Sequence, residues 1–154
     1  PKDNYHQHNS HVIASLIKKF CEAKAYNQTA VTCWGSGKPE REFMHVDDLS
    51  EAVIFCLEKW NPNKSNAPKD QSGNPLYFLN VGTGEDISIL RLSEIISNAV
   101  GYQGKIIWDQ SKPDGTPKKQ LNIEKLKNLG WVPKIKLIDG IAKTVIDFKR
   151  NYLE

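Results

Sequence analysis

The chain has 154 residues, enough for one domain with a sizeable core, and its 39% hydrophobic and 25% charged residues are typical of a folded, soluble protein. A net charge of +3 is too small to indicate nucleic-acid binding, and no apolar run is long enough to span a membrane. We therefore expect a globular protein that has neither nucleic acid nor a membrane as its partner.

The three cysteines, Cys21, Cys33 and Cys56, form no C-x-x-C pair, and each lies in an apolar pattern. We predict buried free thiols in a reducing compartment, and hence a cytoplasmic protein. The chain begins at Pro1 without a methionine, so we expect a fragment of a longer protein.

The chain opens with a predicted helix and a strand. Apolar residues recur at helical spacing after a cap at Asn9 or Ser10, and this helix is expected to end near Ala25. His11 lies in its first turn, beside the cap. The β-branched run 31–34 then predicts a strand.

The next segment predicts a turn, a second strand and a second helix. Two glycines and a proline favour a tight turn over 35–39, and residues 42–46 follow as a short strand. Asp47 and Asp48 suit the start of a helix that runs to Trp60, because carboxylates are favoured near exposed N–H groups. We expect this helix to bury one apolar side, made of Leu49, Ala52, Val53, Phe55, Cys56 and Leu57.

A polar loop, 61–74, separates this helix from the second half of the chain. The nearly continuous apolar run 77–81 predicts a strand buried on both faces of a parallel sheet. Residues 87–90 are expected to form a short strand, and 92–100 a helix that Gly101 ends.

The remaining elements complete an alternation of strands and helices. Residues 105–108 predict a strand, which a proline-stiffened loop follows over 109–119. Helical patterns occupy 123–129 and 137–152. This alternation predicts an α/β or α+β fold.

Two side chains near the glycine-rich turn suggest a binding surface. Trp34 ends the first strand and Arg41 follows the turn, so an aromatic ring and a guanidinium share one rim. Such a pair suits a ligand that is partly planar and partly anionic, because Arg offers a planar fork of donors to phosphate oxygens. The alternative is a hairpin with a surface arginine and a half-buried tryptophan.

Histidines near the start of the chain and a charged loop add two further candidates. His6, His8 and His11 could bind a metal, but they lack partners at a recognisable spacing, and we expect none. His11 alone is either an acid/base catalyst or a surface histidine. The loop residues Lys112, Asp114, Lys118 and Lys119 form either a solvated basic surface or a clamp over phosphates.

Four segments resemble a known family: NSHVIASLIKKF, WGSGKPEREFMHVDDLSEA, NVGTGEDISI and GYQGKIIWDQSKPDGTPKKQL. Together they are similar to the carboxy-terminal part of the GDP-L-fucose synthases, which are extended short-chain dehydrogenases/reductases. R-E-F-x-H-V-D-D and N-V-G-T-G are shared widely in that superfamily. The combination of N-S-H-V-I, W-G-S-G and S-K-P-D-G-T-P is more specific, and only the loop 61–74 falls outside the match.

The resemblance implies an NADPH-dependent enzyme that epimerises and then reduces GDP-4-dehydro-6-deoxy-D-mannose to GDP-L-fucose. It implies that residues 1–154 are the α/β substrate-binding portion, while 77–81 belongs to the Rossmann sheet of the complete protein. The NADP-binding amino-terminal part is then absent, and no Tyr-x-x-x-Lys reductase motif occurs in this chain. We therefore expect the chain alone to be inactive, and the complete protein to be a homodimer.

The resemblance also implies roles for individual residues. His11, from the N-S-H motif, corresponds to one member of the acid–base pair and lies close to the NADP cofactor. Nucleotide-sugar contacts are implied for Lys19, Trp34, Arg41 and Asp114, with Lys119 as a further candidate. Two alternatives stay open: another nucleotide-sugar epimerase or dehydratase, and a stand-alone nucleotide-sugar binding module.

Overall fold

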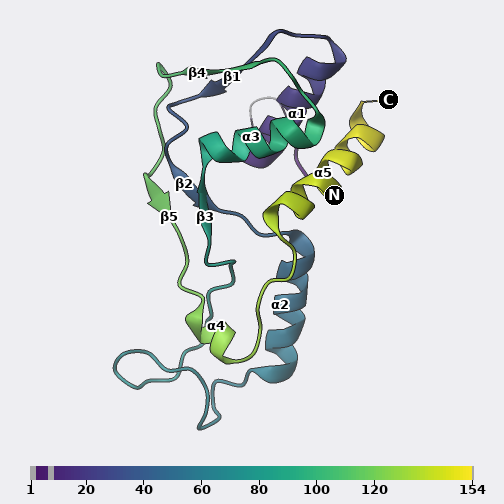
Figure 1. Cartoon of the computed structure of the whole chain (residues 1–154). Helices are drawn as coiled ribbons and strands as arrows, with labels where there is room; N and C mark the ends of the chain where they lie inside the picture. The colour runs from purple at the N-terminus through teal and green to yellow at the C-terminus, as the bar shows by residue number, and fades with distance from the viewer. Residues whose placement is uncertain (1–2, 7–8, 154) are drawn as a thin grey trace. The chain divides into compact units, whose positions relative to one another are not determined.

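The structure, a computed structural model, describes residues 3–6 and 9–153 and has a mixed α/β architecture (Figure 1). In chain order the elements are α1 (Val12–Ala25), β1 (Ala30–Trp34), β2 (Glu40–Glu42), α2 (Val46–Lys59), β3 (Asp86–Ser88), α3 (Ile89–Val100), β4 (Lys105–Asp109), β5 (Lys118–Lys119), α4 (Glu124–Asn128) and α5 (Leu137–Tyr152). Strands β1 and β4 form a parallel pair, and the other three form a sheet in the order β3-β2-β5. No helix in the described part of the chain is long and apolar enough to cross a membrane.

The chain divides into two compact units. Unit 1 contains residues 1–41, 87–118 and 138–154, and unit 2 contains residues 42–86 and 119–137. Because each unit draws on separate stretches of sequence, neither corresponds to one continuous half of the chain.

Unit 1 has a core built from three helices and the first strand. Helices α1 and α3 lie side by side (Figure 1), and their apolar faces are buried, as is one face of α5. The fully or almost fully buried apolar residues include Ala14, Ile17, Phe20, Leu92, Ile96, Val100, Ile141, Val145 and Phe148. Gly101 ends α3 with a left-handed φ of 75°, so this predicted helix end is confirmed.

The start of α1 differs from the prediction. The N-cap residue is His11, with φ −71° and ψ 164°, so the predicted cap at Asn9 or Ser10 is wrong. The backbone N–H of Ser15 donates to the His11 carbonyl at 2.9 Å, and no side-chain cap is found here in the described residues. His11 therefore lies at the N-terminal end of α1, just before its first turn.

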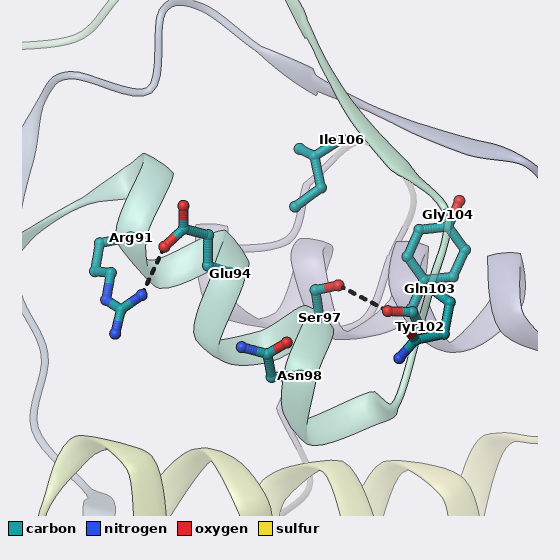
Figure 2. Close-up of a pocket in the computed structure, with 8 residues that line it drawn as sticks. All are labelled: Arg91, Glu94, Ser97, Asn98, Tyr102, Gln103, Gly104 and Ile106. Atoms are coloured by element: carbon teal, nitrogen blue, oxygen red, sulfur yellow. Dashed lines mark hydrogen bonds and ion pairs between the residues drawn. The ribbon is translucent and has the colours of Figure 1, made fainter.

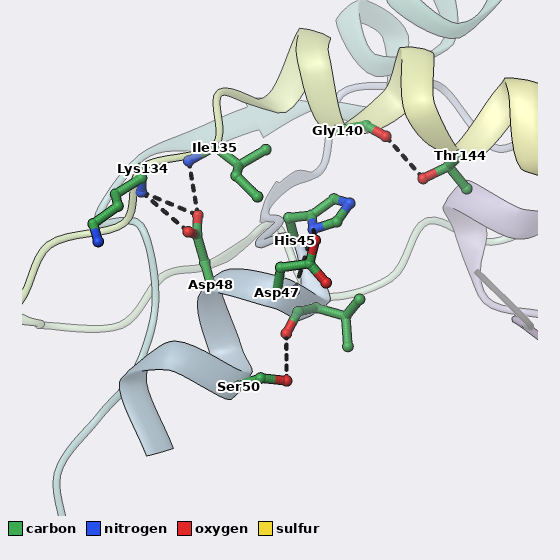
Figure 3. Close-up of polar contacts among 9 residues, drawn as sticks. His45, Asp47, Asp48, Ser50, Lys134, Ile135, Gly140 and Thr144 are labelled. Atoms are coloured by element: carbon green, nitrogen blue, oxygen red, sulfur yellow. Dashed lines mark hydrogen bonds and ion pairs between the residues drawn. The ribbon is translucent and has the colours of Figure 1, made fainter. Parts of the chain in front are cut away.

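A histidine cap also corrects the second predicted strand. Strand β2 ends at Glu42, and His45 caps α2, because its Nδ1 accepts the backbone N–H of Asp47 at 3.2 Å (Figure 3). The ring supplies an acceptor for a helix-end donor that would otherwise lack one. Asp47 and Asp48 do lie in the first turn of the helix, as predicted.

The Asp48 carboxylate is buried and joins α2 to a distant loop. It accepts the backbone N–H of Lys134 at 3.2 Å and that of Ile135 at 2.9 Å (Figure 3). An unpaired buried carboxylate would be costly, so these bonds explain why a charged residue occupies this position.

The predicted buried side of α2 is largely wrong. Ala52 is fully buried, but Leu49, Val53 and Leu57 are 43%, 49% and 81% exposed. The core of unit 2 consists of Ala52, Leu126 and Trp131, with Met44, Phe55, Cys56, Leu79 and Val81 packed around it. One helix face is therefore apolar and open within this unit.

The predicted strand 77–81 is also wrong, because these described residues form no strand. Tyr77 and Phe78 are 71% and 70% exposed. Apolar composition favours burial, but a strand also needs a neighbouring backbone to complete its hydrogen bonds.

The Glu42 carboxylate joins the end of β2 to two later segments of unit 2. Glu42 accepts the backbone N–H groups of Thr83, Gly84 and Leu121, the last two at 2.8 Å. A side chain at Gly82 would collide with the same carboxylate. Glu42 therefore fixes the Gly-Thr-Gly turn and the segment after β5 within unit 2.

The three cysteines are free thiols, as predicted. Cys21 and Cys33 are buried in unit 1, but Cys56 is only half-buried in unit 2, so its predicted burial is wrong. Burial raises the pKa of Cys21 to about 11 and raises the pKa of Cys33 as well.

Candidate functional site

The candidate site lies where β1 and β4 end. The two strands are parallel and Trp34 pairs with Asp109, so both carboxyl ends meet at one edge. Ligands of open α/β sheets bind beyond this edge. The Trp34 side chain is 65% exposed there, and the chain turns immediately afterwards, with Gly35 N–H donating to the Asp109 carbonyl at 3.0 Å.

Two lysines approach the Trp34 ring. The Lys19 ammonium, from α1, lies 5.5 Å from the ring centroid, and the Lys112 ammonium, from the loop after β4, lies 5.6 Å from it. Cations are attracted to the negative face of an indole at these distances. Lys19 is also anchored, because its Nζ donates to the Thr32 carbonyl at 3.0 Å.

Asp114 holds the loop after β4 against the glycine-rich turn. Its carboxylate accepts the backbone N–H of Ser36 at 2.8 Å and the Ser36 hydroxyl at 2.6 Å. These bonds lower the pKa of Asp114, the hydroxyl bond contributing most. Gly35 has φ 78°, and a Cβ at this residue would collide with the Asp114 carboxylate, so only glycine permits the contact.

Arg41 holds the far end of the same loop. Its Nη1 donates to the Thr116 carbonyl and to the Glu40 carbonyl, both at 2.6 Å. In the described part of the chain these bonds engage only Nη1, which leaves donors on Nε and Nη2 available to an anion. Arg41 and Asp114 thus fix the loop at two points, and Lys112 lies between the end of β4 and the first of these points, Asp114.

The other two predicted residues are placed less closely. His11 is exposed at the start of α1, and Lys19 follows it by eight residues, about 12 Å along the helix axis. Lys119 is exposed in β5 and belongs to unit 2. Within unit 1 the structure places Lys19 beside Trp34, joins Asp114 to the residue two positions after Trp34, and joins Arg41 to the end of the Asp114 loop.

Sequence inspection missed Ser36 as the partner of Asp114. The hydroxyl between two glycines in W-G-S-G was the available signal, because a serine in a tight turn is well placed to bond a carboxylate. Lys112 was noted only as part of a charged loop, and its approach to Trp34 depends on the pairing of β1 with β4.

No metal site emerges from residues 3–6 and 9–153, which contain no group of three histidine, cysteine, aspartate or glutamate residues that could hold an ion. His8, one of the three histidines considered, lies outside the described residues.

A polar pocket of about 290 Å³ lies elsewhere in unit 1, beside α3 and the start of β4 (Figure 2). Arg91 and Glu94 pair with each other at 2.7 Å, and the Ser97 hydroxyl donates to the Tyr102 carbonyl at 3.4 Å. The pocket contains none of the predicted site residues. The surface around Trp34 is therefore the better candidate, since it offers an aromatic face, two cations and a guanidinium to a ligand with a ring and phosphates.

Comparisons with known proteins show which proteins the chain is similar to. Residues 1–68 match the model of the NAD dependent epimerase/dehydratase family. The chain is 46% identical, over 99% of its length, to a probable GDP-L-fucose synthase 1 of Oryza sativa subsp. japonica. It is 44% identical, over 98% of its length, to the GDP-L-fucose synthase of Escherichia coli strain K12. It covers 43% and 46% of these two proteins, so it spans less than half of their length.

The fold is shared with a solved structure of the same kind. A GDP-L-fucose synthetase from Naegleria fowleri matches 99% of this chain with a TM-score of 0.80 and 28% identity, and the chain covers 43% of it. A second structure of this synthetase is described as bound to NADP. The predicted α/β fold is therefore confirmed, and it is the fold of the part of this synthetase that the chain matches.

Proposed function

Because the chain is homologous to GDP-L-fucose synthases along almost its whole length, we propose that it is the carboxy-terminal, substrate-binding portion of such an enzyme. The complete enzyme epimerises and reduces GDP-4-dehydro-6-deoxy-D-mannose to GDP-L-fucose with NADPH, whereas residues 1–154 alone are inactive. The observation that carries the proposal is the identity of 42–46% to plant and bacterial relatives over 98–99% of the chain.

The side chains around Trp34 bind the GDP-sugar in this proposal. Trp34 packs against a ring of the ligand, while Lys19 and Arg41 neutralise the diphosphate. Asp114 accepts hydrogen bonds, and Lys119 adds a further cation. The exposure of the indole and the donors still available on Arg41 support these roles.

His11 acts on the sugar as one member of the acid–base pair. A ketone acidifies the neighbouring C–H bonds, so epimerisation requires a base on one face of the sugar and an acid on the other. An exposed imidazole at the mouth of α1 is accessible to a ligand, which supports this role.

NADPH supplies the hydride, and the cofactor is bound mainly by the amino-terminal part, with His11 nearby. The relative solved with NADP supports this cofactor. We also propose a homodimer in the cytoplasm. Three free thiols are consistent with a reducing compartment.

Calorimetric titration of the complete gene product with GDP and UDP tests the proposal. We expect GDP to bind more tightly, and Arg41→Ala to weaken GDP binding about tenfold, because a charge-assisted contact with phosphate is lost. Arg150→Ala is the matched control, since Arg150 is an exposed arginine of α5, and it is expected to leave GDP binding unchanged.

Preference for UDP would favour the alternative of another nucleotide-sugar epimerase or dehydratase.

For His11, we expect His11→Asn to abolish solvent exchange of the acidic sugar protons, which NMR in deuterated water measures. Normal exchange in this variant would remove His11 from the mechanism. Binding of GDP-sugar by a complete gene product that catalyses neither step would favour the stand-alone module.

A further inference from the structure

We propose that Lys112 is an exchangeable cation of the nucleotide-sugar site: it covers the Trp34 ring in the free protein and moves to the diphosphate when a ring of the ligand packs on the indole. This inference rests on the proposed function and adds a residue to it. The loop after β4, which carries Lys112, then contacts either the Trp34 ring or the ligand, depending on whether the site is occupied.

The backbone near Lys112 is fixed close to Trp34. The backbone N–H of Ser111 and its hydroxyl donate to the Asp109 carboxylate at 3.0 and 2.6 Å, and the Lys112 N–H donates to the Asp109 carbonyl at 3.2 Å. Asp109 is the residue that pairs with Trp34 across the two strands. The turn therefore always presents the Lys112 side chain to the same end of the sheet.

The two lysines at the ring are held differently. Lys19 donates a hydrogen bond to the Thr32 carbonyl, which ties its ammonium to β1. For Lys112, the contacts found across the described residues are the Trp34 ring and the charge of Asp109, which its ammonium helps to stabilise. Lys112 is exposed, so its ammonium can leave the ring without breaking a hydrogen bond.

A diphosphate is the stronger partner for this ammonium. A cation over an exposed indole is weakly held, whereas ammonium–phosphate contacts are charge-assisted hydrogen bonds. The flexible stem of lysine lets the charge move while the turn stays in place. The exchange also uncovers the aromatic face, so that a ring of the ligand can pack on it.

The proposal predicts opposite effects on ligands with and without phosphates. In the complete gene product, Lys112→Met keeps the side-chain length and removes the charge, and we expect it to weaken GDP binding about fivefold by calorimetry. Guanosine, which has no phosphate, is expected to bind the variant at least as tightly as the parent protein. Lys112→Arg is expected to restore GDP affinity, and Lys143→Met, at an exposed site of α5, serves as the charge-matched control.

Iodide quenching of tryptophan fluorescence tests the free state. Trp34 is 65% exposed, Trp60 and Trp108 are half-buried, and Trp131 is 4% exposed, so Trp34 is the tryptophan most open to an anionic quencher. A difference between the parent protein and Lys112→Met reports on Trp34, because the Lys112 ammonium lies 5.6 Å from its ring centroid. We expect Lys112→Met to reduce quenching in the free protein, and Lys143→Met to leave it unchanged.

Three results are decisive. If GDP binds the parent protein and Lys112→Met equally well, or if iodide quenches both equally, Lys112 is not an exchangeable cation, while the proposed function stands. If the parent protein does not bind GDP, the proposed function and this inference both fail.

Discussion

The two units of this chain differ in how large an apolar core they enclose. Unit 1 has the larger core, in which Phe20, Leu92 and Ile96 are fully buried, although other large apolar side chains of this unit are exposed. Unit 2 has a small core around Leu126 and Trp131, while the side chains of α2 and of residues 77–78 remain largely exposed. The difference shows that similar apolar patterns can belong to an enclosed core or to an exposed surface of the chain.

Under the proposed function, the missing cover of unit 2 is the amino-terminal part of the enzyme. Large exposed apolar patches mark interaction surfaces in soluble proteins. The proposed nucleotide-sugar site, by contrast, has most of its predicted residues in unit 1. Four experiments sharpen or break this contrast.

The largest effect is expected from paired leucine substitutions. Leu92→Ala removes a fully buried side chain from unit 1 and should lower the free energy of unfolding by about 2–5 kcal/mol. Leu57→Ala, at an 81% exposed site of unit 2, should change the stability of residues 1–154 by less than about 0.5 kcal/mol. Denaturant titration measures both. A large cost for Leu57→Ala in the complete protein, but not in this chain, would show that the surface is covered there.

Asp48 offers a second test, because its buried carboxylate joins α2 to the loop at residues 134–135 of unit 2. Asp48→Asn keeps its shape but removes the charge that binds the Lys134 and Ile135 N–H groups, and it should cost about 1–3 kcal/mol. Asp47→Asn, at the exposed neighbouring position, is the control and should cost much less. Equal losses in chemical denaturation would mean that the buried carboxylate has no special role.

Thiol labelling compares the two units directly. Cys21 and Cys33 of unit 1 are each only 2% exposed, whereas Cys56 of unit 2 is half-buried. Burial raises the pKa of all three thiols, so access of the reagent decides their relative rates. We expect iodoacetamide to modify half-buried Cys56 of unit 2 about tenfold faster, as followed by mass spectrometry. Equal rates at all three cysteines would show that unit 1 opens as readily as unit 2.

The smallest effect concerns exposed carboxylates. Ser36 lowers the pKa of Asp114 in unit 1, and Asn74 lowers that of Asp70 in unit 2. A lowered pKa in the folded state means that each contact stabilises the protein above the ordinary carboxyl pKa of about 3.9 and is lost as the pH falls through the folded value. In carboxyl NMR titrations, Ser36→Ala should raise the pKa of Asp114 and leave that of Asp70 unchanged. A matching rise at Asp70 would point to a global change instead.

Local signals predicted the elements of unit 1 well. The β-branched run became β1, the periodic run after residue 137 became α5, and Gly101 ended α3 as expected. Each depends on residues near one another in sequence, and each finds its packing partner within unit 1.

The errors fall mainly in unit 2. Sequence pattern indicated that 77–81 and one face of α2 are apolar, but it could not show whether anything in this chain covers them. The sequence pattern placed His45 in a strand. Its role as a helix cap could not be predicted, because it depends on a hydrogen bond from the Asp47 N–H to a ring nitrogen, which only the structure shows. Family resemblance located Asp114, but its bond to Ser36 joins residues 78 positions apart and needed the structure.

The contact between Gly35 and Asp114 also constrains how relatives of this chain can diverge. Any side chain at position 35 needs the space that the Asp114 carboxylate fills, and the positive φ of Gly35 disfavours other residues even without that carboxylate. Substitutions at positions 35 and 114 should therefore be rare, and in an alignment of relatives a change at one position should accompany a change at the other.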